Sequence, residues 1–424
     1  ALIPLFTILV FALAIILTLF KSLPYILKVQ KKLDRMTLVL RERFIGAKII
    51  RAFDNSKKER DKFNDVAQEY TDNYIIINKK FALLSPMAFA LMSIVITLII
   101  FFGAMKVLNN TLEIGSITAI VEYSLTTIAA LIMSSMVLVQ MPKAVVSIER
   151  IEELLNVTSE IKDKEELKDN SYYENILKQN PIFLTFDNVC FRYKGAEKQI
   201  LKNISFSVKA GERFAIVGAT GSGKSTIAKV LLRLNDIESG RILINGVDAL
   251  DLPLNCLRNQ ISYTPQKAYI FSGKIKDNFR FTNKDMTDEE MIKIAKIAQS
   301  YDFIDSLPDK FDSFVAQGGI NFSGGQKQRL SIARALSKDS NIYLFDDSFS
   351  ALDYATDAKL RKELKTFLKD KITIIIAQRL NTIADADKII VLKDSEITGM
   401  GTHQELLESN QEYIELAKSQ GILE

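Results

Sequence analysis

Three long apolar stretches constrain the fold of this chain more than any other feature. They cover residues 1–20, 81–108 and 114–141, and the first contains no charged residue. A helix of about 20 apolar residues is long enough to cross a lipid bilayer. The sequence therefore predicts three membrane-spanning helices. The alternative is three buried helices of a soluble bundle, which the length of the stretches and the lysines flanking them disfavour.

Positive charges at the ends of these stretches predict which side of the membrane each end faces. Lys and Arg follow the first stretch, precede the second and follow the third, at Lys21, Lys28, Lys31, Lys32, Lys79, Lys80, Lys143 and Arg150. Such residues concentrate on the cytoplasmic side, so residues 109–116 form a short external loop. Glu122, in the third stretch, lies either in a transport pathway or near the outer headgroups, and both interpretations stay open.

Residues 21–80 are polar and helix-prone, which predicts two helices that leave the membrane and return to it. Near the middle, the sequence FIGAKIIRAF at residues 44–53 places a compact apolar group in a charged context. A short helix at the tip of a hairpin has this pattern, and its apolar face either binds a partner or packs within the hairpin. Residues 1–155 are thus predicted to be part of a transmembrane domain. The charged residues 156–180 are predicted to be a linker that ends before Pro181.

A phosphate-binding loop follows in the second half of the chain. Residues 213–217 have the pattern of a short buried strand, and GATGSGKST at residues 218–226 leads from it into a helix. Glycines in such a loop let backbone amides surround phosphates, Lys224 reaches the β- and γ-phosphates, and Ser225 ligates Mg²⁺. The motif predicts ATP and Mg²⁺ as cofactors. The predicted nucleotide-binding residues here are Gly218, Thr220, Gly221, Ser222, Gly223, Lys224, Ser225 and Thr226.

Two further segments are suited to nucleotide chemistry. A Ser-Gly-Gly turn opens an amphipathic helix at Ser323, and the bare amides of a helix N-terminus bind anions. The other interpretation is an ordinary capped helix, because Ser323 is a good N-cap. Residues 342–345 are apolar and deliver Asp346 and Asp347 as a buried strand does, with Asp346 placed to hold the metal. Gln266 also ends a predicted strand, although by itself such a residue usually lies on the surface.

Taken together, these residues resemble the ATP-binding cassette (ABC) exporters over essentially the whole chain. GATGSGKST is similar to the Walker A motif, FSGGQ to the signature, IYLFDD to the Walker B motif, SALD to the D-loop, YTPQ to the Q-loop, and FIGAKIIRAF to the coupling helix. The resemblance implies a multidomain protein with an α-helical transmembrane domain and an α/β P-loop nucleotide-binding domain, here residues 181–424. It also implies that residue 1 falls near the fourth of six membrane helices.

The family pattern assigns roles to further residues. Tyr193 is expected to stack on adenine, and Gln266 to bind the metal together with Ser225 and Asp346. Two half-transporters meet so that each ATP lies between one Walker A motif and the opposite signature, which explains two phosphate-binding devices on one chain. The residues that this chain offers to the partner's ATP are Ser323, Gly324, Gly325 and Gln326, beside Asp353 of the D-loop.

Two departures from the family pattern concern hydrolysis. Asp347 stands where the family has a catalytic Glu, and Gln378 stands where it has a switch histidine. The sole histidine, His403, lies elsewhere and does not replace it. A general base has to come within about 2.6–3.2 Å of its water, and Asp is shorter than Glu by one methylene. Gln378 still donates hydrogen bonds, but it carries no charge and shuttles no proton.

These departures predict the degenerate half of a heterodimeric exporter, with Asp347 and Gln378 at a site that binds Mg-ATP and hydrolyses it slowly. The partners expected are a second, non-identical half-transporter, membrane lipid and a transported substrate. A homodimeric exporter that uses Asp347 as base, and an ATP-gated channel or regulatory subunit, remain alternatives. A soluble P-loop ATPase of DNA maintenance is disfavoured by the three spans.

Composition agrees with a multi-pass protein of the cell membrane whose nucleotide-binding domain is cytoplasmic. Hydrophobic residues make up 48% of the chain, which is high for a soluble protein. The net charge is only +4 and the basic residues are dispersed, which argues against a nucleic-acid partner. Cys190 and Cys256 are far apart in sequence and predict ordinary thiols in a reducing compartment. A signal peptide is not recognisable at residue 1, and we expect the sequence to start within a longer protein.

Overall fold

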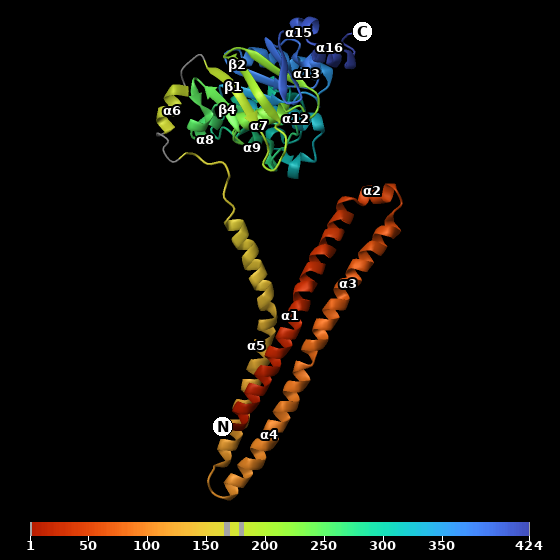
Figure 1. Ribbon diagram of the computed structural model, residues 1–424, viewed down its shortest axis with the longest axis vertical. Helices are drawn as coiled ribbons and strands as arrows, with labels where there is room; N and C mark the ends of the chain where they lie inside the picture. The colour runs from red at the N-terminus through yellow and green to blue at the C-terminus, as the bar shows by residue number, and fades with distance from the viewer. Residues whose placement is uncertain (1, 165–169, 178–181, 424) are drawn as a thin grey trace. The chain divides into compact units, whose positions relative to one another are not determined.

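The computed structural model describes residues 2–164, 170–177 and 182–423. It divides into two compact units, residues 1–158 and residues 159–424, and each is considered by itself. The first unit is helical and the second combines helices with β-sheets (Figure 1).

The helical unit consists of long helices joined by very short connections. In chain order they are α1 (Leu2–Ile45), α2 (Ala47–Ala52), α3 (Ser56–Ala82), α4 (Leu84–Leu108) and α5 (Ile114–Leu155). Helices α1 and α3 form the predicted hairpin, with α2 at its tip (Figure 1). Contacts between the two helices define their antiparallel register. Lys80 Nζ of α3 donates to Lys21 O of α1 at 3.0 Å, and near the tip Lys62 Nζ lies 3.4 Å from Glu42 Oε2.

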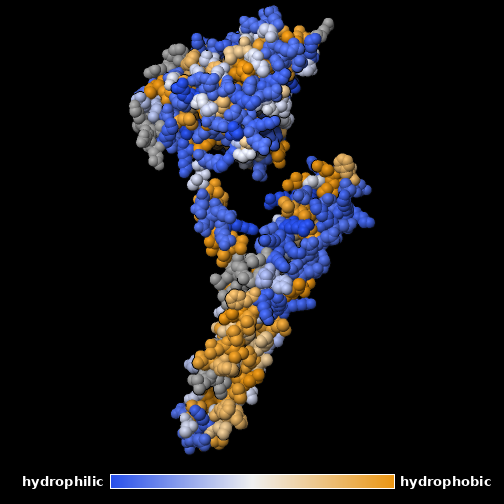
Figure 2. Space-filling model, viewed as in Figure 1, coloured by the Kyte–Doolittle hydropathy of each residue, from blue (hydrophilic) through white to orange (hydrophobic). Residues whose placement is uncertain are grey.

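The apolar residues of this unit lie in a band and in a separate group at the tip of the hairpin. Among the described residues, three helical stretches are long and apolar enough to cross a membrane, at Leu9–Ile45, Ser56–Leu108 and Ile114–Ser134. Figure 2 shows apolar surface over α4 and the neighbouring parts of α1 and α5, and polar surface over most of α3. At the tip, the exposed apolar side chains around α2 are Phe44, Ile45, Ile49 and Phe53. Glu122 lies on α5 with its side chain exposed within this unit.

The second unit is built around a largely parallel sheet in the order β12-β11-β3-β10-β9-β6, with β12 antiparallel at one edge. These strands are β3 (Arg213–Gly218), β6 (Ile261–Thr264), β9 (Ile342–Asp346), β10 (Ile372–Ile376), β11 (Lys388–Lys393) and β12 (Glu396–Gly401). A second sheet has the order β2-β1-β4-β5, and β7 pairs with β8. Their strands are β1 (Phe183–Phe191), β2 (Leu201–Lys209), β4 (Ser239–Ile244), β5 (Val247–Asp248), β7 (Gly273–Lys274) and β8 (Phe314–Val315).

Apolar cores cover both faces of the parallel sheet. Strand β3 is buried throughout, and its side chains alternate, with Phe214 and Ile216 in the core shared with the second sheet and Ala215 and Val217 in the core shared with the helices. A parallel strand that is covered on both faces typically consists of a continuous run of apolar residues, as β3 does at residues 214–217. The helices of this unit are α6 (Asn170–Leu177), α7 (Lys224–Leu231), α8 (Leu254–Asn259), α9 (Ile275–Phe279), α10 (Asp288–Ile297), α11 (Tyr301–Asp305), α12 (Gly324–Leu336), α13 (Tyr354–Phe367), α14 (Leu380–Ile383), α15 (His403–Ser409) and α16 (Gln411–Ser419).

The segment predicted as a linker, residues 156–180, contains the helix α6. Tyr173 and Leu177 of this helix are buried in the core beside the second sheet, and α6 packs near α8. The two side chains are four residues apart and therefore lie on one face of the helix. This part of the segment consequently belongs to the folded second unit. Residues 165–169 and 178–180, which the linker prediction also covers, lie outside the described residues.

Candidate nucleotide-binding site

The predicted phosphate-binding loop connects β3 to α7, as the sequence pattern requires. Backbone packing explains two of its glycines. A Cβ at Gly218 would lie 2.2 Å from Leu392 O, and one at Gly223 would lie 2.6 Å from Ile200 O. Gly223 also has φ +100 and is the N-cap of α7, so a left-handed residue ends the loop and starts the helix. The loop thus presents the amino end of α7 in a conformation that larger residues do not allow.

Lys224 begins α7, and its side chain is folded back over the loop. Its Nζ donates hydrogen bonds to Gly218 O and Ala219 O, both at 2.7 Å, and the side chain is buried. Burial lowers the pKa of Lys224, while the nearby Asp347 and Asp346 carboxylates act in the opposite direction. In this position the Lys224 ammonium lies beside the backbone amides with which such a loop binds phosphates, and it is suited to donate hydrogen bonds to the same phosphates.

Ser225 and Asp346 form the candidate metal position. The Ser225 hydroxyl donates to Asp346 Oδ1 at 3.0 Å, which joins the start of α7 to the end of β9. Burial raises the pKa of Asp346, although the hydrogen bonds from Ser225 and Tyr263 lower it. A hydroxyl and a carboxylate side by side are the oxygen donors that Mg²⁺ prefers. These residues therefore fit the predicted ion.

Tyr263 is absent from the predicted site, yet its hydroxyl donates to Asp346 Oδ2 at 3.4 Å. Burial raises the pKa of Tyr263 above its usual range, and the negative charge of Asp346 adds to this effect. The phenol therefore stays a hydrogen-bond donor to the carboxylate. Its strand β6 lies next to β9 in parallel, which the sequence of β6 alone does not reveal.

Asp347 lies directly after β9, and its carboxylate contacts Gln266. The Gln266 Nε2 donates to Asp347 Oδ2 at 3.2 Å. Asp347 has a left-handed backbone with φ 46, and its amide donates to Ile376 O at 2.8 Å. The structure thus places the predicted metal ligand Gln266 in contact with Asp347, one of the two residues predicted to govern hydrolysis. The amide of Gln266 occupies one oxygen of the short carboxylate.

Gln378 follows β10, which lies between β3 and β9 in the sheet. Since the carboxyl ends of these parallel strands share one edge, Gln378 is placed at the same edge as the loop and Asp347. Its side chain is exposed, and its backbone oxygen accepts a hydrogen bond from Gln420 Nε2 at 2.8 Å. His403 instead has its Nδ1 2.6 Å from the Tyr413 hydroxyl, between α15 and α16.

Tyr193, the predicted adenine-stacking residue, is held beside α7. Its hydroxyl accepts a hydrogen bond from Lys229 Nζ at 3.2 Å, and its ring packs edge-on against Phe191 with the centroids 4.8 Å apart. The ring is half-buried, so part of it faces solvent. An aromatic ring fixed next to a phosphate-binding helix is suited to stack on a base.

The signature residues form the amino end of α12. Ser323 is its N-cap: its hydroxyl accepts from Gln326 N at 3.3 Å, while its own amide donates to Gln326 Oε1 at 2.9 Å. Ser323 and Gly324 are exposed, and a Cβ at Gly325 would lie 3.3 Å from Ala351 O. The capped-helix interpretation is therefore correct for Ser323. The exposed Gly324 leaves the first turn open to an approaching group.

Asp353 of the predicted D-loop is the N-cap of α13. Its Oδ1 accepts from Thr356 N at 2.9 Å, and hydrogen bonds from Thr356 lower the pKa of Asp353. The structure gives this residue a local role at the start of a helix. The signature helix α12 packs against α9, α10 and β6, whereas α7 packs against β3 and β9. The two phosphate-binding devices are thus carried by different parts of the unit.

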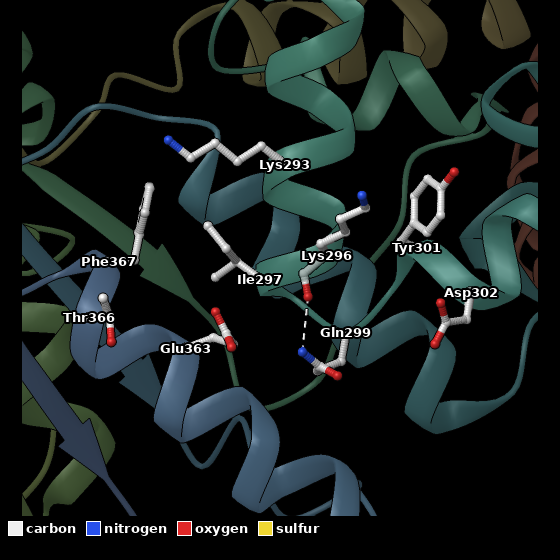
Figure 3. A pocket seen from close by; sticks show the side chains of 9 residues that line it. All are labelled: Lys293, Lys296, Ile297, Gln299, Tyr301, Asp302, Glu363, Thr366 and Phe367. Carbon is white, nitrogen blue, oxygen red and sulfur yellow. Dashed lines mark hydrogen bonds between the residues drawn. The ribbon is translucent and has the colours of Figure 1, made fainter.

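A cavity of this unit lies away from these residues. It has a volume of about 810 Å³ and lies between α10, α11 and α13 (Figure 3). None of the predicted site residues is among its described lining residues, which are Lys293, Lys296, Ile297, Gln299, Tyr301, Asp302, Glu363, Thr366 and Phe367. Its walls mix both signs of charge and lack a Gly-rich loop. The phosphate chemistry therefore points to the edge of the sheet and not to this cavity.

Comparison with known proteins identifies the family. The family called ABC transporter transmembrane region matches residues 1–131, and the family called ABC transporter matches residues 201–350. An uncharacterized ABC transporter ATP-binding protein of Mycobacterium tuberculosis is 34% identical over 403 residues, covering 94% of this chain and 68% of that protein. The chain belongs to the ABC transporter family.

Two further similarities indicate the type of ABC transporter. The mitochondrial iron-sulfur clusters transporter ATM1 of Saccharomyces cerevisiae is 35% identical over 376 residues, or 88% of this chain and 54% of that protein. The solved structure of a bacterial Atm1-family ABC exporter with ATP bound matches with a TM-score of 0.83 and 28% identity, covering 98% of this chain and 72% of that one. The predicted fold class is confirmed: a helical transmembrane region is followed by an ABC nucleotide-binding domain.

Membership of the family also carries consequences for function. The ABC transporter domain implies ATP binding and ATPase activity. Helices apolar enough to span the bilayer, in the region that matches the ABC transporter transmembrane family, confirm the prediction of a membrane protein. ABC exporters work as dimers, so a second half completes the transporter.

Proposed function

We propose that this ABC transporter is the degenerate half of a heterodimeric exporter. It binds Mg-ATP at its own Walker motifs and hydrolyses it slowly, while its signature completes a faster site on a non-identical partner. The observation that carries this proposal is Asp347 at the position of the catalytic base, with its Oδ2 3.2 Å from Gln266 Nε2. A carboxylate that is short by one methylene and bound to an amide is a poor base for water.

The residues that bind nucleotide support the other half of the proposal. The support comes from the Lys224 hydrogen bonds, the Ser225–Asp346 pair and the Tyr193 ring, to which we assign phosphate, metal and base, respectively. Their contacts do not involve the side chain of Asp347. ATP binding therefore does not depend on the residue that weakens hydrolysis.

The signature supports the proposed contribution to a partner. Ser323 and Gly324 are exposed at the amino end of α12, where helix amides and the positive end of the dipole attract an anion. We propose that Ser323, Gly324, Gly325 and Gln326 contact the γ-phosphate of the ATP that the partner's Walker motifs hold. Closure of the two cassettes then drives the membrane helices through the apolar tip around α2, and the substrate is exported.

The experiment that tests this function is native mass spectrometry of the full-length transporter purified from its own cells. Two different subunit masses in one complex are expected. Sequencing of the partner is expected to give Glu and His at the positions equivalent to Asp347 and Gln378. A complex of two identical chains with rapid ATP turnover would refute the heterodimer and make Asp347 a working base.

A further inference from the structure

Gln420, just after α16, makes a two-point contact with the loop that carries Gln378. Its Nε2 donates to Gln378 O at 2.8 Å, and its Oε1 accepts from Leu380 N at 2.8 Å. The two contacts join residues that are 42 and 40 positions apart in sequence. Neither the sequence motifs nor the proposed function above assigns a role to Gln420.

Hydrogen bonds hold the backbone on both sides of the Gln378 side chain, and the contact with Gln420 is the one on its carboxyl side. Immediately before Gln378, Ala377 N donates to Ile216 O of β3 at 3.1 Å. A side chain that bonds one carbonyl and the amide two residues later imitates the pairing of a neighbouring strand. A primary amide is suited to this because it carries a donor and an acceptor in one plane. The backbone partners also determine which amide atom is oxygen and which is nitrogen.

The element that carries Gln420 is itself anchored. Tyr413 and Ala417 of α16 are fully buried in the core, and the Tyr413 hydroxyl lies 2.6 Å from His403 Nδ1. Lys393 of β11 lies 3.1 Å from Glu412 at the start of the same helix. The exposed Gln420 is therefore presented by a fixed helix and not by a free tail.

We infer that Gln420 is a positioning residue that fixes the loop so that the Gln378 amide faces the γ-phosphate of ATP bound to this chain. The inference rests on the proposed function, in which Gln378 stands at the position of the family's switch histidine, and it assigns to the Gln378 amide the role of sensing that phosphate. Donors that are held in place before the ligand arrives bind it without the cost of ordering them. The Gln378 side chain is exposed, so its direction depends on the backbone that Gln420 holds.

The test measures how well this chain distinguishes ATP from ADP, since only ATP has the γ-phosphate. The full-length transporter is photolabelled with 8-azido-ATP, and labelling of this chain is competed with ATP or with ADP. Gln420→Ala is expected to lower the ratio of ATP affinity to ADP affinity about fivefold. This is the effect of losing one ordinary hydrogen bond, here the one between the Gln378 amide and the γ-phosphate. Gln420→Glu is expected to lower it as well, because it keeps the acceptor for Leu380 N and loses the donor for Gln378 O. Gln411→Ala, which removes an exposed amide from the same helix, is the control and leaves the ratio unchanged.

Gln378→Ala separates this inference from the proposed function. If Gln378→Ala lowers the ratio and Gln420→Ala does not, the positioning role is refuted and the sensing role of Gln378 stands. If neither variant changes the ratio, both are refuted. Equal losses of ATP and ADP affinity in Gln420→Ala, accompanied by a lower Tm, would show a merely structural contact and would also refute the inference.

Discussion

Lengthening Asp347 by one methylene is the perturbation that most directly tests the proposal that this site hydrolyses ATP slowly. Asp347→Glu extends the carboxylate by about 1.5 Å, the length of one carbon–carbon bond. A general base has to approach its water to about 2.6–3.2 Å, and a misplacement of about 1 Å costs about 100-fold in rate. We expect Asp347→Glu to raise hydrolysis at this site by about 10- to 100-fold, with the lower value if Gln378 limits the gain.

The contact with Gln266 adds to the expected change. In the structure its amide donates to Asp347 Oδ2 at 3.2 Å, so one oxygen of the carboxylate is occupied. A glutamate at the same backbone position places its oxygens beyond the present position of this contact. The second substitution, Gln378→His, is expected to add a further increase, since a histidine both donates a hydrogen bond and transfers a proton.

The assay is steady-state ATP hydrolysis by the full-length transporter in lipid. In the partner half, the Glu expected at the position equivalent to Asp347 is replaced by Gln. This substitution inactivates the partner's site, so that the assay measures hydrolysis at this chain's site. Asp339→Glu is the matched control, because it adds the same methylene to an exposed carboxylate that precedes β9 at its other end. If Asp347→Glu leaves the rate unchanged, or if Asp347→Ala in an otherwise unmodified complex abolishes turnover, the explanation based on side-chain length is wrong.

Three other predictions concern binding and stability. Ser225→Ala is expected to lower ATP affinity about tenfold in Mg²⁺ and to change it little in EDTA, because Ser225 and Asp346 are the proposed metal ligands; an equal loss in both conditions would contradict this. Tyr193→Ala is expected to lower the affinities for ATP and for ADP equally, by about fivefold or more, because the ring stacks on the base. Tyr193→Phe is expected to retain both affinities, since it keeps the ring and loses only the hydrogen bond with Lys229. Competition photolabelling measures both, and a loss of affinity in Tyr193→Phe would contradict the stacking role. Asp353→Ala is expected to lower the Tm by about 2 °C through loss of a helix N-cap, and Asp353→Asn to restore it in a fluorescence melting assay; an unchanged Tm would leave the cap without a measurable role.

Local sequence was sufficient for the elements whose conformation is set by adjacent residues. The glycines at 218 and 223 predict a loop that approaches other backbone closely, and both close approaches are present. Long apolar stretches likewise predict the spans, because a helix that hydrogen-bonds internally is the way for such a segment to cross a bilayer. In each case the signal lies within the segment itself, although the atoms that Gly218 and Gly223 approach, Leu392 O and Ile200 O, lie outside it.

Contacts between distant segments could not be predicted in the same way. Tyr263 with Asp346, and Gln420 with Gln378, depend on the order of strands in the sheet and on where α16 packs. A sequence motif contains neither piece of information. The helix α6 is a different case, since the apolar pair Tyr173 and Leu177, at helical spacing, was a local signal within the predicted linker.

In the proposed function, the end of β9 is where nucleotide binding and hydrolysis depend on different residues. Asp346 is the last residue of the buried strand, and Ser225 and Tyr263 hold its two oxygens from either side. Asp347 is one residue further, beyond the strand, with a left-handed backbone and a partly exposed side chain. The metal position therefore depends on the sheet, whereas the reach of the base depends on the length of one side chain. A substitution of Glu by Asp at this position shortens that reach and leaves the ligands of Mg-ATP in place.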